Sequence, residues 1–196
     1  MANVSRINGF RPVKHLNGSP YNGAVNLYAI LAADNTATFV GDLVKLSGTA
    51  SADGVASVAQ AAAGNAVIGA IVGFVPDYSN LNTPGQYRVA STLRYVWVAD
   101  SPDLVFECQA DNGGAALAIT DVGRAANIVV GAGSTSTGQS AMVLDSSSAA
   151  TNTATFPLKI LGFSSRVDNE VGGNDSKALV MINAHQLTSG AGIAGI

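Results

Sequence analysis

The chain has 196 residues and a net charge of −3, with charged residues making up only 12% of it. This length is sufficient for one domain, or two small ones, with a well-buried core. The acidic balance argues against nucleic-acid binding, because neutralising phosphates requires clustered cations. The longest strongly apolar stretch, residues 66–75, is too short for a membrane span. A single cysteine, Cys108, excludes an intrachain disulfide.

Residues 1–24 are predicted to form an extended N-terminal arm. Gly9 and Pro12 interrupt the helix-like spacing of its apolar residues. Two interpretations remain open: a frayed terminus, or a strap that orders against a partner protein. Phe10 and Tyr21 favour the strap, because both rings would otherwise be exposed to water. The arm contains no acid and carries three cations: Arg6, Arg11 and Lys14.

The body, residues 25–187, is predicted to be all-β, with a β-sandwich or jelly-roll-like arrangement. Short strands separated by clusters of Gly, Asn, Asp and Ser are typical of sandwiches, jelly rolls and barrels. At most one short helix is expected, over residues 115–121. The expected strands cover residues 26–32, 38–46, 55–60, 67–75, 92–98, 104–109, 127–131, 141–144, 155–163 and 177–182.

The strands at 92–98 and 104–109 are predicted to pair as a hairpin. The turn residues 100–103, Asp-Ser-Pro-Asp, separate them. Alternation places the largest residues of each strand on one face. Both faces are therefore expected to line the core, with these residues packed in it: Leu93, Tyr95, Trp97, Leu104, Phe106 and Cys108.

The body contains a weak internal repeat of two short motifs. Val-Gly-Asp at 40–42 precedes Ile-Val-Gly-Phe at 71–74, and Asp-Val-Gly at 121–123 precedes Ile-Leu-Gly-Phe at 160–163. Two related β units would explain it, but the unequal intervals favour coincidence.

No constellation of catalytic or metal-binding residues emerges from the sequence. Neither a zinc motif nor a Gly-x-Ser-x-Gly nucleophile motif occurs. His185 is interpreted as a surface or capping residue, and Cys108 as a buried thiol. Residues 190–195 match the dinucleotide pattern Gly-x-Gly-x-x-Gly but lack the helix that must follow it. We therefore expect a small-residue tail over 188–196 and neither enzymatic activity nor a cofactor or metal.

Several segments resemble the head decoration, or cement, proteins of tailed bacteriophages, and the resemblance covers nearly the full length. The arm contributes Asn-Gly-Phe-Arg-Pro-Val at 8–13 and Gly-Ser-Pro-Tyr-Asn-Gly at 18–23. The other segments lie at 40–46, 69–74, 87–92, 105–107, 161–163 and 168–170.

The resemblance implies a structural protein on the outer surface of the virion capsid. Such proteins are synthesised in the host cytoplasm and bind the phage major capsid protein, as dimers or trimers at symmetry axes. The expected contact residues lie on the arm: Arg6, Phe10, Arg11, Lys14 and Tyr21. A receptor- or glycan-binding head-fibre or adhesin module is the alternative. Polar loops at 131–138 and 145–155 and the ring of Tyr78 favour it, whereas the expected burial of Trp97 counts against it.

Overall fold

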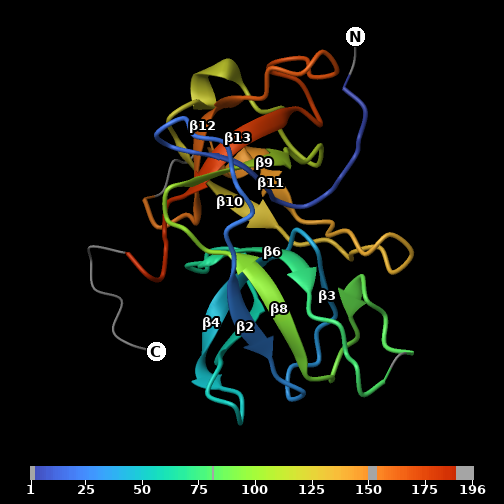
Figure 1. Ribbon diagram of the computed structural model, residues 1–196. Coiled ribbons are helices and arrows are strands. Elements are labelled where there is room, and N and C mark those ends of the chain that lie inside the picture. Colours follow the sequence, from blue (N-terminus) through green and yellow to red (C-terminus); the bar gives the residue numbers. More distant parts are fainter. Residues whose placement is uncertain (1–2, 81, 150–153, 189–196) are drawn as a thin grey trace.

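The computed structural model describes residues 3–80, 82–149 and 154–188 of the chain. The predicted all-β, sandwich-like fold is confirmed, since strands supply almost all of the regular structure (Figure 1). Among the described residues, helical structure is limited to a 3-10 turn at Ile119–Asp121 and the short helix α1, Ser146–Ala149. The polar loop expected at residues 145–155 is therefore wrong at its start, because residues 146–149 form α1.

Five strands of the N-terminal half close into a barrel. Their spatial order is β2–β5–β4–β6–β8, with β2 also paired to β8. The barrel interior is apolar and includes Tyr28, Ile30, Phe74 and Val96. The barrel strands are β2 (Asn26–Ile30), β4 (Leu43–Ala50), β5 (Ala56–Gln60), β6 (Gly69–Phe74) and β8 (Arg94–Ala99). Two short strands, β3 (Thr38–Phe39) and β7 (Tyr87–Arg88), pair with each other.

The C-terminal half and the arm form a six-stranded sheet in the order β1–β9–β13–β12–β10–β11. An isolated parallel bridge between Ala110 and Leu144 also connects the end of β9 to β11. The bridge therefore links the first and last of the five strands β9, β13, β12, β10 and β11, while β1 remains an edge strand. Its strands are β1 (Arg11–His15), β9 (Leu104–Gln109), β10 (Ala125–Val129), β11 (Val143–Asp145), β12 (Leu158–Phe163) and β13 (Lys177–Ile182).

The two halves share one strand topology. In chain order, β2, β4, β5, β6 and β8 of the barrel match β9, β10, β11, β12 and β13 of the sheet. Every antiparallel pair of the barrel has a counterpart in the sheet, and the parallel β2–β5 pair matches the Ala110–Leu144 bridge. The same folding pattern therefore occurs twice, closed in the barrel by the Ala29–Ser57 pair of β2 and β5 and in the sheet half by the Ala110–Leu144 bridge.

The motifs of the weak internal repeat, at 40–42 with 71–74 and at 121–123 with 160–163, occupy matching places in these halves. The Gly41 amide donates to the Ile71 carbonyl at 2.8 Å, and the Gly123 amide donates to the Ile160 carbonyl at 2.8 Å. Both glycines have a positive φ, 94° and 88° respectively. That conformation bends the backbone, so the single strand expected at 38–46 is wrong, and β3 and β4 flank a turn at 40–42.

The predicted hairpin of residues 92–98 and 104–109 is also wrong. The strand β8 belongs to the barrel and β9 to the sheet, and residues 100–103 connect the two halves. Leu104, Phe106 and Cys108 face the core, but Leu93 and Trp97 face outward, 47% and 39% exposed. The opposite face of β8 supplies the barrel core because Val96 and Val98 point inward. Alternation alone could not indicate which face that would be.

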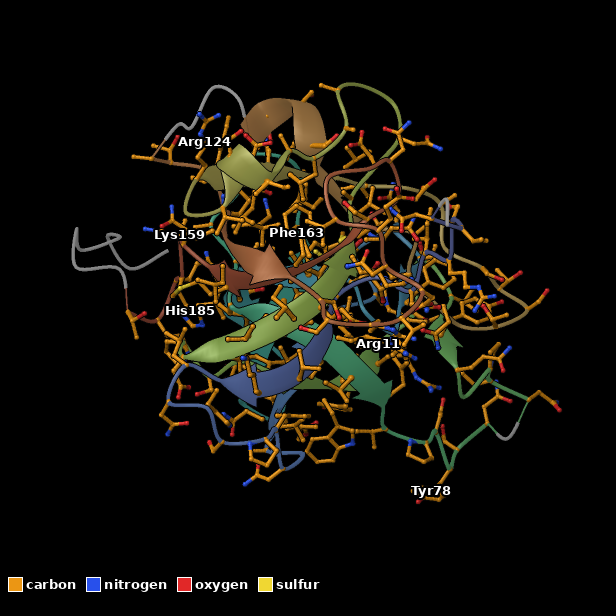
Figure 2. The ribbon with its side chains drawn as sticks, turned by 90° about the horizontal axis from the view of Figure 1, so that it is seen from above. Arg11, Tyr78, Arg124, Lys159, Phe163 and His185 are labelled. Carbon is orange, nitrogen blue, oxygen red and sulfur yellow. The ribbon has the colours of Figure 1, made fainter. Side chains whose placement is uncertain are left out.

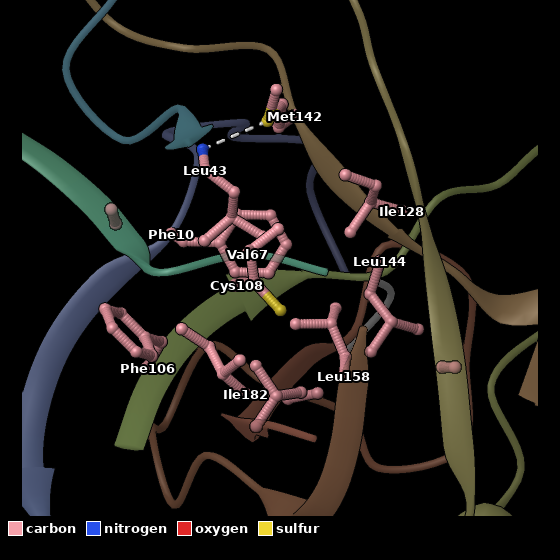
Figure 3. Packing of buried hydrophobic residues seen from close by; sticks show 14 of the residues in the cluster. Phe10, Leu43, Val67, Phe106, Cys108, Ile128, Met142, Leu144, Leu158 and Ile182 are labelled. Carbon is pink, nitrogen blue, oxygen red and sulfur yellow. Dashed lines mark hydrogen bonds between the residues drawn. The ribbon is translucent and has the colours of Figure 1, made fainter. Parts of the chain in front are cut away.

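The main core lies in the sheet half and extends to where the halves meet (Figure 3). It combines Phe106, Ile128 and Leu158 from the sheet with Leu43 and Val67 from the barrel half. The two halves therefore share one buried apolar cluster rather than meeting through a polar interface.

Candidate functional site: the N-terminal arm and its groove

The arm packs against its own chain instead of extending from it. The strand β1 pairs antiparallel with β9, with Arg11 opposite Glu107. Phe10 is only 1% exposed and belongs to the main core. The backbone at Gly9 has φ of 66°, and a Cβ there would lie 2.5 Å from the Gly41 carbonyl oxygen. A glycine is therefore required where the arm crosses the bend at Gly41.

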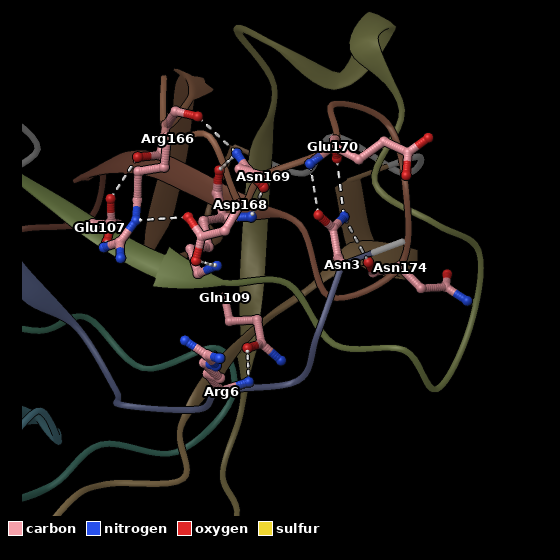
Figure 4. A network of polar contacts seen from close by, with 11 residues as sticks. Asn3, Arg6, Glu107, Gln109, Arg166, Asp168, Asn169, Glu170 and Asn174 are labelled. Carbon is pink, nitrogen blue, oxygen red and sulfur yellow. Dashed lines mark hydrogen bonds and ion pairs between the residues drawn. The ribbon is translucent and has the colours of Figure 1, made fainter. Parts of the chain in front are cut away.

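Polar contacts hold the arm near its start and at the end of β1. Near its start, the Asn3 side-chain amide donates to the carbonyl oxygens of Glu170 and Asn174, both at 2.9 Å (Figure 4). At the end of β1, His15 Nδ1 lies 3.0 Å from an Asp103 carboxylate oxygen. Both open interpretations of the arm, a frayed end and a strap that needs a partner to order, are thereby replaced by intramolecular docking.

The predicted contact residues of the arm fall into two groups. Phe10 is buried, so its ring is not free for a partner, whereas Tyr21 is half-buried against the main core and lines a cavity beside the arm. The expectation for Phe10 is wrong because the arm buries that ring within its own chain. Arg6, Arg11 and Lys14 are exposed.

The apolar residues beside these cations were not among the predicted contact residues. Four of the exposed large apolar side chains lie on the arm, with exposed fractions of 40–59%: Val4, Ile7, Val13 and Leu16. We call these four residues together with Arg6, Arg11 and Lys14 the arm surface. Apolar and cationic side chains thus alternate in sequence along the exposed part of the arm, a composition typical of interaction surfaces.

A network of four charged side chains lies beside the arm (Figure 4). Arg166 pairs with Glu107 and with Asp168, each at 3.1 Å, and Lys177 pairs with Asp168 at 3.1 Å. The second Glu107 carboxylate oxygen accepts a hydrogen bond from the Ser164 hydroxyl at 2.5 Å. The hydrogen bond from Lys177, followed by that from Arg166, lowers the pKa of Asp168 below its usual value. Within this network two cations compensate two carboxylates.

Residues of the arm and of this network together line two adjoining cavities. The larger has a volume of about 600 Å³ and the smaller about 130 Å³. Their linings share Asn8, Arg11, Glu107 and Arg166. Pro12, Val13, Val40, Ile71 and Val72 give the larger cavity an apolar wall, whereas Arg6 and Lys177 line the smaller one. We call the two cavities together the arm groove.

The arm groove carries excess positive charge on an acidic protein. Four cations and two carboxylates line it. Arg166 and Lys177 compensate Glu107 and Asp168, which leaves Arg6 and Arg11. Over the described ranges 3–80, 82–149 and 154–188, neither of these two guanidinium groups forms an ion pair. The groove can therefore attract a carboxylate or another anion.

A second surface lies on the outward face of β8. Trp97 stands opposite Leu27 of β2 in the strand register, and Leu93 is exposed on the same face. A cavity of about 420 Å³ adjoins it, lined by Tyr78 and Tyr95 among others. Tyr78 is 82% exposed and projects from the edge of the molecule (Figure 2).

The part of the chain that the structure describes contains no group of three or more His, Cys, Asp or Glu side chains placed to hold a metal ion. Burial raises the pKa of the Cys108 thiol far above its usual value, so the thiolate is suppressed. His185 is 3% exposed, which makes its assignment as a surface residue wrong. Its Nε2 lies 3.0 Å from the Asp100 carbonyl oxygen, and its Nδ1 accepts the Leu187 amide at 3.2 Å, so both nitrogens are engaged.

No protein-family model, no curated protein and no solved structure matches this chain. None of the helices among the described residues has the length and apolar character needed to cross a membrane. The dinucleotide-like pattern at 190–195 and most of the expected tail lie outside the described residues.

Proposed function

We propose that this protein is a non-enzymatic structural component of a bacteriophage virion. In this proposal it binds the outer surface of the assembled head, as a dimer or trimer, and stabilises the head by contacting neighbouring capsid subunits. Binding the assembled lattice in preference to free subunits stabilises the lattice by mass action. Several contacts on one oligomer add avidity without strong individual interfaces.

One observation carries the proposal: segments that resemble decoration proteins lie on the arm, where the exposed cationic and apolar side chains also lie. The segments at 8–13 and 18–23, which resemble head decoration proteins, lie on the arm, and the arm surface combines uncompensated cations with exposed apolar side chains. The mechanism differs from that of a strap that folds on contact. Because the arm is already docked through Phe10, it presents its outer residues without a large ordering cost.

The proposal is tested by adding purified protein to undecorated heads of the phage that encodes it and counting bound copies by quantitative mass spectrometry. Saturation at a copy number comparable to that of the capsid protein is expected. Lys14→Glu combined with Leu16→Asp should abolish decoration, because both changes alter the arm surface without touching the core. Lys159→Glu is the control for the charge reversal at Lys14, since Lys159 is exposed on β12, far from Arg11 of the arm (Figure 2). Normal decoration by the arm variant would contradict the proposal.

The alternative of a glycan-binding module is favoured by one specific observation. Trp97 was expected to be buried, but 39% of it is exposed, and it lies on the same strand face as Tyr95, which lines the neighbouring cavity. Open aromatic faces are the usual platforms for sugar rings, and the Tyr95 hydroxyl donates to the Asp53 carboxylate nearby. A glycan array probed with the protein and with Trp97→Ala tests this candidate. Signals that disappear in the variant would support it, and an empty array would remove it.

A further inference from the structure

The arm groove joins an apolar hollow to two cations, Arg6 and Arg11, that form no ion pair within the described residues. Its larger cavity, about 600 Å³, has room for a bulky side chain. Val72 of β6 is 37% exposed on one wall, and Val13 of β1 is 41% exposed on the other. Apolar groups at an open hollow of this kind gain free energy when a partner covers them.

The cationic end of the groove lies beside this hollow. Arg11 and Arg166 line both cavities, and Arg6 lines the smaller one. Arg166 is held by Glu107 and Asp168 at 3.1 Å, which leaves it little capacity for a further carboxylate. Arg11 is exposed and unpaired within the described residues, so its guanidinium can receive a carboxylate in a bidentate, charge-assisted contact.

We propose that the arm groove binds an extended peptide segment of the capsid protein that combines carboxylates with a bulky apolar side chain. The inference rests on the proposed function, because it assigns the chemistry of the partner segment. The apolar side chain enters the hollow between Val13 and Val72, and the carboxylates contact Arg11 and Arg6. Charge complementarity selects an acidic segment over a basic one. The net positive groove on a chain of net charge −3 also steers such a segment towards the arm.

Strand addition to β1 is a less suitable mode of binding for this segment. Pro12 lies in the middle of β1 and has no amide to donate. The carbonyl oxygen of Val13 already accepts the Tyr21 amide at 3.1 Å, and the His15 amide donates to Ser19 at 2.9 Å. Recognition therefore depends on side chains, which makes it sensitive to single substitutions.

The test uses the intact protein and a fluorescently labelled peptide in which Glu alternates with Val and Leu. Three comparison peptides replace Glu by Lys, Glu by Gln, or the apolar residues by Ser. Fluorescence anisotropy should show that the acidic, apolar peptide binds and that affinity falls with added salt. Arg11→Glu should weaken binding by at least about tenfold, and Val72→Ser should weaken it as well. Lys159→Glu, which makes the same change of charge far from the groove, should leave binding unaltered (Figure 2).

Several outcomes would overturn the inference. These are equal binding of the acidic and basic peptides, equal effects of Arg11→Glu and Lys159→Glu, and no binding of the acidic, apolar peptide. A change of oligomeric state in Arg11→Glu, measured by sedimentation, would assign the groove to a second copy of this chain instead. Thermal unfolding of each variant at the wild-type temperature verifies that the arm is still docked. Head decoration without peptide binding would refute only this inference. Peptide binding without decoration would refute the proposed function and the capsid protein as partner, and would leave only the chemistry of the groove.

Discussion

Phe10→Ala tests whether the arm is an integral part of the fold. Phe10 is 1% exposed and shares the main core with residues of both halves, including Leu43 and Phe106 (Figure 3). Removing a fully buried Phe ring costs about 3–5 kcal/mol of unfolding free energy, through lost transfer energy and the cavity left behind. For a chain of this size, each kcal/mol lowers the melting temperature by roughly 2–4 °C. A decrease of about 6–20 °C is therefore expected.

Urea unfolding followed by circular dichroism measures the free energy, and a thermal scan measures the temperature shift. Ile7→Ala is the matched control, because Ile7 lies three residues earlier on the same arm and is 40% exposed. Its substitution should cost under about 1 kcal/mol. If Phe10→Ala were no more destabilising than Ile7→Ala, the arm would contribute nothing to the core and the docked description would be wrong.

Three further predictions concern buried positions. His185 has a lowered pKa because burial disfavours its charged form. The unfolded chain therefore binds protons more readily than the folded one, and the stability of the wild-type protein should decrease below pH ~6.5. The midpoint of urea unfolding measures this decrease, and His185→Gln should remove it. Arg88→Met leaves four carbonyl oxygens without their guanidinium donor, those of Leu31, Asp34, Thr36 and Thr92, and should cost about 3 kcal/mol or more in urea unfolding; a cost below that of an exposed substitution would contradict this role. Gly9→Ala should lower the melting temperature through about 1–3 kcal/mol of backbone strain and the clash with Gly41, and an unchanged melting temperature would show that the arm need not cross there.

The sequence predicted the arm's cations but not where the arm docks. Arg6, Arg11 and Lys14 are exposed, as expected for charged residues on a chain with few other charges. The burial of Phe10 depends on a pocket built from β9 and the bend at Gly41, which no local pattern around Phe10 describes. The uncompensated charge of the groove was equally hidden, because Glu107, Arg166 and Asp168 meet only after β9 and the loop after β12 come together.

The residue patterns were sufficient by themselves for the all-β class and for most strand positions, because alternation and turn residues act over a few neighbours. They could not determine that the strand at 92–98 closes a barrel instead of pairing with the next strand, at 104–109. Alternation places Leu93, Tyr95 and Trp97 on one face. Which face is buried is determined by how β8 pairs with its neighbours, β2 and β6. The repeated topology likewise became visible only through pairings such as that of Ala110 with Leu144. Such long-range pairings depend on the whole chain, and they decide which side chains are left at the surface to meet a partner.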